Sequence, residues 1–522
     1  MANQFDAVII GSGINSLVSG AMLAKKGWRV AVIERNDRLG GAIATRTDIF
    51  PGYTVELLSS WHPLFIGGPA YAELAGDLIR LGVEYLNTED PTGVVCDAGS
   101  AILSTNAARN EAQFRELGDL DAWNAVMSDF GGRAELAFGL LGTDFWRPGA
   151  AKFGWKAWRK LGRRGLLASG AELLEPAAPW VDRTFQSPVT KALLAPWALH
   201  NGLGPDDAAS AFITKVIAAA ISMGGMPIPV GGGVKLVEAL CTVIAEAGGE
   251  LVTNAEAVSI EVVGGKAKSV KTAAGDTYFA RKAILASVTP QALYLNLLDP
   301  AIVPAQFSAA ALSFRYGRAG MQIHLAMSEP PNWTTPGMEK VALVHVLDSM
   351  DSLSESVNAA NRGFLPRRPT IVVGQPVAID PSRAPVGAGL LWIQLQEVPS
   401  EIRGDLAGEI DHTGSWTTDV RDRYADRVIS QLKKHISNID SQVTAKKVLG
   451  PADLAQLDVN LVGGDPYAGD CRVDQYAVWR PLSLANGHNT GIKGLWHIGA
   501  STHPGPGLGA GSGYLVAKRL LD

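Results

Sequence analysis

The sequence predicts an α/β fold with a parallel sheet. Residues 5–10 read FDAVII, an apolar and partly β-branched run that is typical of a strand buried on both faces of such a sheet. Residues 15–26 then place apolar side chains at helical spacing before Gly27, and residues 29–33 form a second apolar run. Of the 522 residues, 47% are hydrophobic and 19% charged, which supplies enough apolar material for a large core. We therefore expect a strand-helix-strand unit at the start of a globular chain.

Charge, cysteine and histidine content exclude several kinds of function. The formal charge is −5 and there is no basic tail, which argues against nucleic acid as a partner. The three cysteines lie too far apart for a disulfide framework or a CxxC motif, and the nine histidines have no metal-binding spacing, so no metal is expected. The start lacks signal-peptide features, and the apolar residues 216–230 are too short and too broken by glycine and proline to span a membrane. We expect a cytoplasmic protein.

The turn after the first predicted strand contains Gly11 and Gly13. Two glycines let the backbone approach a pyrophosphate, whose charge a helix N-terminus stabilises. Glu34 follows the second strand, where a carboxylate accepts hydrogen bonds from ribose hydroxyls and disfavours a 2′-phosphate. Ser16 replaces the third glycine of the common GxGxxG motif. The whole pattern predicts a site for NAD or FAD rather than NADP.

A second glycine-rich turn helps to distinguish these two cofactors. Arg35 and Arg38 follow the ribose acid, and Gly40 and Gly41 come next. Positive charge and uncovered amides so close to the ribose site suit a ligand longer than the adenosine half. The sequence therefore favours FAD.

A third glycine-rich segment lies near the C-terminus. Residues 494–500, GLWHIGA, predict a short buried strand, and a helix is expected over 514–521. Five glycines occupy alternate positions from 505 to 513 between them. Since glycine costs about 0.5–1 kcal/mol inside a helix or strand, these glycines suggest the close approach of a large planar ligand. We expect this helix N-terminus to stabilise negative charge on the pyrimidine side of a reduced flavin.

Several segments resemble the phytoene desaturase-related FAD-dependent oxidoreductases, a superfamily that includes FAD amine oxidases and carotenoid desaturases. They are GSGINSL with ERNDRLGG, PVGGGVKLVEAL, NLVGGDPYAGDCRVDQYAVWRP and GLWHIGASTHPGPGLGAGSG. The resemblance implies FAD-binding roles in a pyrophosphate loop, a ribose site, a ribityl turn, an adenine-pairing strand and a flavin-facing turn. The pyrophosphate loop is Gly11, Gly13, Ile14, Asn15 and Ser16, and the ribose site is Glu34, Arg35 and Arg38. The ribityl turn is Gly40, Gly41 and Ala42, the adenine-pairing strand contains Val258, and the flavin-facing turn contains Gly499, Ala500, Gly507 and Leu508.

These segments predict two interleaved domains. A discontinuous Rossmann-like FAD-binding domain of the glutathione reductase type is expected in residues 1–100, 225–295 and 455–522. An α+β substrate domain, with a mixed sheet and helical cover, is expected in residues 101–224 and 296–454. The glycines at 231–233 resemble a second NAD motif, but no ribose acid follows the next strand, which favours a structural turn. We therefore expect reoxidation by oxygen, a quinone or another external acceptor.

The expected reaction is hydride transfer from a carbon of an apolar, isoprenoid or aromatic, molecule to flavin N5. His503 and His62 are candidates to orient the substrate or take a proton, with a structural role as the alternative for each. Asp474, Gln475 and Arg480 are expected either to close the site or to form ion pairs. Two other functions stay open: an FAD amine or alcohol oxidase that makes hydrogen peroxide, and a non-catalytic flavin-binding assembly protein.

One predicted helix has an unusual surface. Residues 152–164 place Lys152, Lys156, Arg159, Lys160 and Arg163 on one face, with Trp155 at its margin and Trp158 away from it. Such a face suits the interface of a membrane that holds a lipophilic substrate. The alternative is a solvated basic face. Self-association of the chain is left open.

Overall fold

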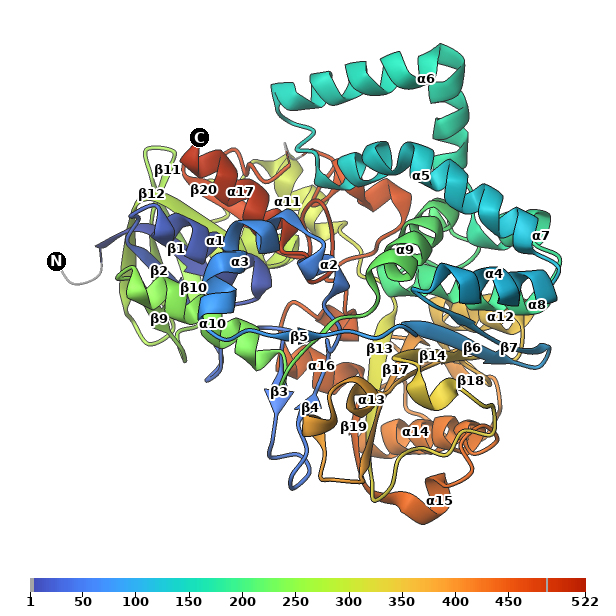
Figure 1. Cartoon of the computed structure of the whole chain (residues 1–522). Coiled ribbons are helices and arrows are strands. Elements are labelled where there is room, and N and C mark those ends of the chain that lie inside the picture. Colours follow the sequence, from blue (N-terminus) through green and yellow to red (C-terminus); the bar gives the residue numbers. More distant parts are fainter. Residues whose placement is uncertain (1–3, 485–486) are drawn as a thin grey trace.

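The computed structural model describes residues 4–484 and 487–522, and two seven-stranded sheets organise it (Figure 1). The first sheet has the order β10-β11-β12-β1-β2-β9, and β20 also pairs with β12. Its strands are β1 (Gln4–Ile10), β2 (Val30–Ile33), β9 (Glu250–Val252), β10 (Ala257–Val263), β11 (Lys266–Thr272), β12 (Thr277–Ser287) and β20 (Leu495–Ile498). The strand pairs β1–β2, β1–β12, β2–β9 and β12–β20 are parallel, which confirms the predicted α/β class.

The apolar run of β1 is buried on both faces because successive side chains point in opposite directions. Ala7 and Ile9 pack beneath helices, whereas Val8 and Ile10 face the core formed with residues 292–314. The covering helices are α1 (Ile14–Lys25), α3 (Pro69–Arg80), α10 (Val234–Glu246) and α17 (Gly511–Leu521). Helix α17 starts earlier than expected and includes two of the C-terminal glycines.

The second sheet has the order β19-β13-β17-β16-β14-β6-β7. Its strands are β6 (Thr92–Cys96), β7 (Gly99–Leu103), β13 (Ala319–Met327), β14 (Leu343–Val346), β16 (Ile371–Gly374), β17 (Gly389–Val398) and β19 (Val443–Leu449). It is mixed, because β6 pairs with β14 in parallel and the other pairs are antiparallel. Helix α14 (Thr418–Leu432) covers one face through Val420, Tyr424 and Val428.

One predicted domain boundary is corrected. A boundary at residue 100 divides β7 and assigns β6 to the FAD-binding part, but both strands belong to the second sheet. The β6–β7 hairpin looks local in sequence, and only its parallel pairing with β14, some 250 residues later, assigns it to the other sheet.

Residues 107–224 form a helical layer, as the sequence predicts. The helices are α4 (Ala107–Glu116), α5 (Leu120–Gly142), α6 (Pro148–Leu174), α7 (Ala177–Thr184), α8 (Pro188–Leu194) and α9 (Ser210–Gly224). Helix α5 is continuous over its 23 residues, and helix α8 gives way to a 3₁₀ turn at residues 195–201, where Pro196 lies. Most of α6 lies apart from the body of the molecule in Figure 1.

Short elements complete the chain. They are β3 (Thr45–Arg46), β4 (Val55–Glu56), α2 (Pro63–Ile66), β5 (Tyr85–Leu86), β8 (Ile228–Pro229), α11 (Ala305–Leu312), α12 (Met350–Asn361), β15 (Phe364–Leu365), α13 (Pro376–Ile379), β18 (Gly404–Asp405), α15 (Ile439–Gln442) and α16 (Pro451–Leu457).

Candidate functional site

A cavity of about 1300 Å³ extends from the carboxyl end of β2 to the helical layer over the second sheet. Its two halves differ in chemistry. Glycines and helix N-termini line the half beside the first sheet, and aromatic and aliphatic side chains line the half beside the second sheet. We call these the cofactor half and the substrate half.

The cofactor half brings together most of the predicted FAD-binding residues. All three glycine-rich segments that the sequence singled out reach this wall, although the third lies more than 450 residues after the second. The predicted residues that line it are Gly11, Gly13, Ile14, Asn15, Glu34, Arg35, Gly40, Gly41, Ala42, Gly499, Ala500, Gly507 and Leu508.

Two helices begin at this wall with amides free for an anion. Gly13 precedes α1 and Ala510 precedes α17; neither supplies a side-chain cap, and neither helix has an acidic residue in its first turn. Each N-terminus therefore presents a partial positive charge to the cavity. Such ends suit a pyrophosphate at one place and a flavin that becomes anionic on reduction at the other.

Glycines let the three segments meet closely. The Cα of Gly13 lies 2.9 Å from where a Cβ on Gly41 would be, and a Cβ on Gly513 would overlap the carbonyl oxygen of Asn15. The Gly513 N–H also donates to Asn15 Oδ1 at 3.0 Å, which ties the start of α17 to α1. These contacts leave the cavity wall as bare backbone, as close approach to an extended cofactor requires.

Glu34 is buried at the end of β2, where the adenosine ribose is expected. Its carboxylate accepts hydrogen bonds from the Ser12 N–H at 2.9 Å and the Ser12 hydroxyl at 2.7 Å, and from the Asn36 N–H at 2.9 Å. These bonds fix the carboxylate at the cavity wall, and its remaining lone pairs can accept ribose hydroxyls. Beside it, Arg35 and Glu256 form an ion pair of 3.8 Å at the same end of the cavity.

Three predicted cofactor residues lie behind or beside the wall instead of on it. Ser16 is fully buried within α1, and Arg38 supports the ribityl turn by donating to the Gly41 carbonyl at 3.0 Å. Val258 is exposed on β10, and the cavity is lined by the preceding residues Ala255, Glu256 and Ala257. The expected direct contacts of these three residues with FAD are not supported by their positions.

Neither predicted catalytic histidine lines the cavity. His62 is fully buried before α2, where its Nδ1 lies 3.0 Å from the Tyr85 hydroxyl. His503 packs edge-on against Phe145 behind the flavin-facing turn. Burial lowers the pKa of His62 to about 3 and that of His503 to about 4, so both rings are neutral. Their positions correct the sequence prediction: a histidine next in sequence to a cavity residue points the other way.

Among its described residues, the substrate half carries no charged side chain, and the polar Asn201, Gln322, Gln394 and Gln396 line it beside aromatic and aliphatic residues. Among the residues that the structure describes, the charged ones lining the whole cavity are Glu34, Arg35, Glu256 and Asp458, and all four belong to the cofactor half. Apolar side chains of α9 and three tryptophans form much of the remaining wall. They are Trp61, Trp197, Ile213, Val216, Ile217, Ile221 and Trp392.

A pair of histidines that sequence reasoning missed lies at this apolar wall. His200 lines the cavity, and its Nε2 is 2.9 Å from Nε2 of the fully buried His345 on β14. The Trp197 ring lies against His200 in a tilted arrangement, with ring centroids 4.4 Å apart. Burial lowers the pKa of His200 to about 3 and holds that of His345 well below its usual value, so both rings are neutral.

The tautomer of this pair follows from what surrounds it. His345 Nδ1 is buried without a partner among the described residues, and a buried unpaired N–H is rarer than a buried unpaired acceptor. We therefore assign the shared proton to His345 Nε2, so that His200 accepts it and carries its own proton on Nδ1. The histidine that lines the cavity is then a neutral hydrogen-bond donor. No local sequence motif predicts this pair, because 145 residues separate its two members.

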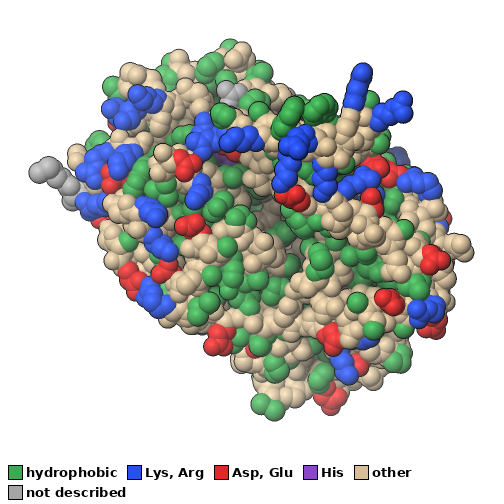
Figure 2. Space-filling model, turned by 45° about the horizontal axis from the view of Figure 1, so that its top comes forward, with side chains coloured by type: hydrophobic (Ala, Val, Ile, Leu, Met, Phe, Trp, Pro, Cys, Tyr) green, Lys and Arg blue, Asp and Glu red, His purple; other side chains and the backbone are tan. Residues whose placement is uncertain are grey.

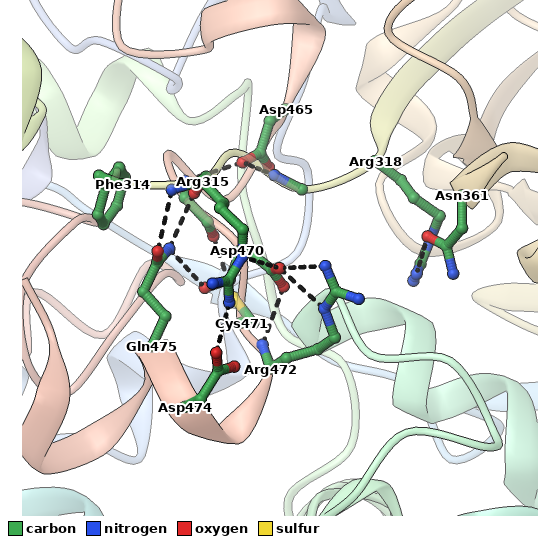
Figure 3. A network of polar contacts seen from close by, with 12 residues as sticks. Phe314, Arg315, Arg318, Asn361, Asp465, Asp470, Cys471, Arg472, Asp474 and Gln475 are labelled. Carbon is green, nitrogen blue, oxygen red and sulfur yellow. Dashed lines mark hydrogen bonds and ion pairs between the residues drawn. The ribbon is translucent and has the colours of Figure 1, made fainter. Parts of the chain in front are cut away.

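Tyr467 and Tyr476 also line the substrate half, and a polar network holds the loop that carries them (Figure 3). Asp465 accepts the N–H groups of Gly317, Tyr467 and Gly469, each at 2.8 Å. Arg315 pairs with Asp474 at 2.7 Å, and its backbone exchanges hydrogen bonds with the side-chain amide of Gln475.

The buried Arg480 completes this support by donating to the carbonyls of Tyr467 and Ala500 at 2.8 and 3.0 Å. It thereby links the tyrosine loop to the flavin-facing turn. The sequence predicts that Asp474, Gln475 and Arg480 either close the site or form ion pairs. The three residues form ion pairs and hydrogen bonds and do not line the cavity, which supports a structural role.

The turn at residues 231–233 is closed by carboxylates. The Gly231 N–H donates to Asp380 at 2.9 Å and the Gly233 N–H to Glu56 at 2.6 Å, while the buried Arg383 pairs with both acids. Carboxylates so placed repel a phosphate, which supports the predicted structural turn. Among residues 4–484 and 487–522, no three His, Cys, Asp or Glu side chains are grouped as metal ligands.

The fold and the cofactor half define an FAD-dependent oxidoreductase. Residues 17–444 match the family described as flavin containing amine oxidoreductase, and the chain belongs to this family. The predicted resemblance and the predicted FAD cofactor are thereby confirmed.

Curated relatives span nearly the whole chain. The chain is 26% identical to rat (Rattus norvegicus) pyridine nucleotide-disulfide oxidoreductase domain-containing protein 2, over 99% of this chain and 94% of the relative. It is 23% identical to a component of the limonene dehydrogenase of Castellaniella defragrans, over 99% and 95%. It is 22% identical to the lycopene-forming phytoene desaturase of Paracoccus sp., over 99% and 97%.

Solved structures share the fold. An oxidoreductase from Methanosarcina mazei superposes with a TM-score of 0.59 at 17% identity, covering 98% of this chain and 99% of that one. Putrescine oxidase bound to putrescine superposes with a TM-score of 0.60 at 13% identity, covering 99% of each chain.

Proposed function

We propose that this oxidoreductase removes a hydride from one carbon of a neutral, apolar, isoprenoid or aromatic molecule, while the neighbouring carbon releases a proton to the solvent and a C=C bond forms. The observation that carries the proposal is the absence of any charged side chain among the described residues that line the substrate half of the cavity. A cationic substrate would leave its charge unpaired there, which is costly in an apolar site, whereas an apolar molecule gains by burial. Limonene dehydrogenase and phytoene desaturase, by their names, act on limonene and phytoene, which agrees with such a substrate.

The chain's own residues bind the cofactor, orient the substrate and shield both from water. FAD, when bound, supplies the hydride acceptor at flavin N5. Gly13 and the start of α1 would hold its pyrophosphate, Glu34 would hold its ribose, and the start of α17 would stabilise negative charge on its ring system. The tryptophan-rich wall excludes water, and His200 donates a hydrogen bond to a neutral polar group or a π-system of the substrate. Positioning, more than acid or base catalysis, accelerates the reaction.

The domain assignment belongs to the same proposal. The β1–α1–β2 unit, with its glycine turn and terminal Glu34, supports a Rossmann-like FAD domain of the glutathione reductase type. The external electron acceptor is oxygen, a quinone or another oxidant, and the carboxylates at Gly231 and Gly233 argue against an internal NAD site.

An FAD amine or alcohol oxidase is the second candidate. Tyr467 and Tyr476 line the cavity, and an aromatic surround can hold a neutral amine or alcohol carbon beside a flavin. In this case reoxidation by oxygen would produce hydrogen peroxide.

Anaerobic mixing of the holoenzyme with a matched panel tests the proposal. The panel holds a cyclic terpene, a linear isoprenoid, the corresponding alcohols and the corresponding amines, and loss of flavin absorbance is followed. We expect a hydrocarbon to bleach the flavin and charged amines to leave it oxidised. Bleaching by amines or alcohols with no response to hydrocarbons would select the oxidase instead.

A further inference from the structure

Helix α6 is unusual because so little of it is covered. Of its 27 residues, only Ala157 is buried. Gly162 interrupts the helix with φ +66°, and the first half, residues 148–161, extends over α5. Such a helix gains little stability from a core, so its exposed faces need another explanation.

The exposed face of α6 is strongly basic in an acidic protein. Residues 145–171 contain seven Lys or Arg and no Asp or Glu, whereas the whole chain has a net charge of −5. Lys156 pairs with Glu135, and Lys160 donates to the Gly132 carbonyl at 2.7 Å. Lys152, Arg159, Arg163 and Arg164 have no ion pair within the part of the chain that the structure describes. Figure 2 shows Lys and Arg side chains standing out from the upper part of the molecule.

Two tryptophans are exposed on the same half of the helix. Trp155 and Trp158 stack with ring centroids 4.9 Å apart and keep 59% and 47% of their surface exposed. Tryptophan has a large apolar ring and a polar N–H, and it therefore favours the boundary between water and lipid. A basic face that contacts only water would gain nothing from exposed tryptophans. Their presence beside unpaired cations therefore favours a lipid interface over a solvated basic face.

The helix lies next to the apolar mouth of the cavity. The Phe153 ring packs against α5 at Gly139, and the adjacent Phe138 lines the cavity. Phe138, Leu64 and Met223 are all cavity-lining residues that remain 44%, 56% and 65% exposed, so they rim its opening. An apolar rim of this kind marks a surface that meets an apolar partner.

We propose that the first half of α6 docks on an anionic lipid surface and brings the cavity mouth to the membrane. The unpaired cations attract acidic headgroups, the two tryptophans enter the interface, and an apolar substrate passes from the lipid to the cavity. The contact is peripheral, because no helix in the described ranges 4–484 and 487–522 is long and apolar enough to cross a membrane. A nucleic acid would satisfy the cations but would leave the tryptophans and the apolar rim in water. The membrane contact goes beyond the proposed function and depends only on the surface residues of α6 and the cavity mouth. The passage of an apolar substrate from the lipid rests on the proposed function.

Flotation of the holoenzyme with vesicles tests the proposal. One set contains equal parts of phosphatidylcholine and phosphatidylglycerol, and the other contains phosphatidylcholine alone. We expect flotation with the anionic set only, decreasing as salt is added. Two charge reversals, Arg159→Glu with Arg163→Glu, should weaken binding at least about tenfold, since each cation contributes about 1 kcal/mol near an anionic surface.

The matched control is Lys268→Glu with Lys271→Glu, which reverses two exposed lysines on β11. It should float like the parent protein. Trp155→Ala with Trp158→Ala should also reduce flotation, and the parent but not this variant should lose tryptophan fluorescence with brominated lipids. Because these side chains are exposed, all variants should keep the FAD content and melting temperature of the parent protein.

Several results would overturn the proposal. They are failure of the parent to float with anionic vesicles, equal loss of flotation in the control, unchanged flotation of Arg159→Glu with Arg163→Glu, and binding to duplex DNA without binding to vesicles. The test is separate from that of the proposed function. A detergent-solubilised substrate should bleach the flavin of the charge-reversed variant at the parent rate, and an unreactive flavin would leave the flotation result intact.

Discussion

At the residue scale, Glu34 connects a sequence motif to a cofactor contact that we predict. Its carboxylate is held by Ser12 and Asn36 at the cavity wall. We expect Glu34→Ala to raise the FAD dissociation constant about 10- to 100-fold, because hydrogen bonds to a charged group contribute about 1.5–3 kcal/mol. Reconstitution of the apoprotein followed by flavin fluorescence measures this constant.

The control for this change is Glu250→Ala. Glu250 lies at the start of the adjacent strand β9 and pairs with Arg29 without lining the cavity. Its FAD affinity should equal that of the parent. If Glu34→Ala binds FAD as tightly as the parent protein, a residue other than Glu34 binds the ribose.

His200 offers a test of the substrate half. His200→Phe keeps an aromatic ring against Trp197 but removes the hydrogen-bond donor and the contact with His345. We expect the anaerobic flavin-reduction rate with the best substrate of the panel to fall about tenfold or more. FAD content should not change. His412→Phe, outside the cavity lining, is the control, and equal rates in parent and His200→Phe would assign the pair a packing role.

Glu397 predicts a pH dependence of stability. It is fully buried on β17, where burial raises its pKa from 4.5 to about 7; Thr370 and Arg318 oppose the shift. Between these two pH values the unfolded chain loses this proton and the folded chain keeps it, so the free energy of unfolding falls as pH rises from about 4.5 to 7. The total loss is at most about 3 kcal/mol.

Glu397→Gln should remove this loss. We expect the variant to gain on the order of 1–3 kcal/mol over the parent at pH 8, and the gain to disappear below pH 4.5. Urea unfolding across this range measures it. A constant difference between the two proteins at all pH values would show that Glu397 is ionised in the folded state.

At the scale of elements, the contact between α1 and α17 holds the cofactor half together. A methyl group at residue 513 would overlap the Asn15 carbonyl oxygen, and backbone cannot yield as a flexible side chain does. We therefore expect Gly513→Ala to destabilise the fold by about 1–3 kcal/mol and to weaken FAD binding, since both helix N-termini must move. Thermal unfolding and FAD content measure the two effects.

Gly170→Ala is the matched control. Gly170 is also helical, in α6, and a Cβ there meets no described atom within 4 Å. This change should stabilise the helix by up to about 1 kcal/mol. A similar loss of FAD in both variants would mean that the α1–α17 contact has no special part in cofactor binding.

At the scale of the whole molecule, the cavity between the two sheets is the site we propose for FAD. Binding to the folded state alone should stabilise it by about 2.7 kcal/mol when free FAD is 100 times its dissociation constant. Removal of FAD should therefore lower the melting temperature and increase hydrogen exchange at residues 40–42, 499–501 and 505–509, which line the cofactor half. Equal melting curves for apoprotein and holoprotein would contradict this placement.

The helical layer and the second sheet were predictable as elements but not as neighbours. Residues 322–327 (QIHLAM) and 390–396 (LLWIQLQ) are short and rich in apolar residues, as is typical of strands, and both lie in strands, β13 and β17. The position of β6 and β7 in the second sheet depends on β14, and no local pattern encodes a pairing at such sequence separation.

The sequence by itself determined the cofactor half, because a strand, a glycine turn, a helix and a following acid are each specified by neighbouring residues. Gly11, Gly13 and Glu34 needed no tertiary contact to be recognised. Tertiary structure decided the substrate half: it turned His62 and His503 away from the cavity and paired His200 with His345. Side-chain direction at a cavity depends on packing between segments far apart in the chain, and periodicity within one segment carries no information about it.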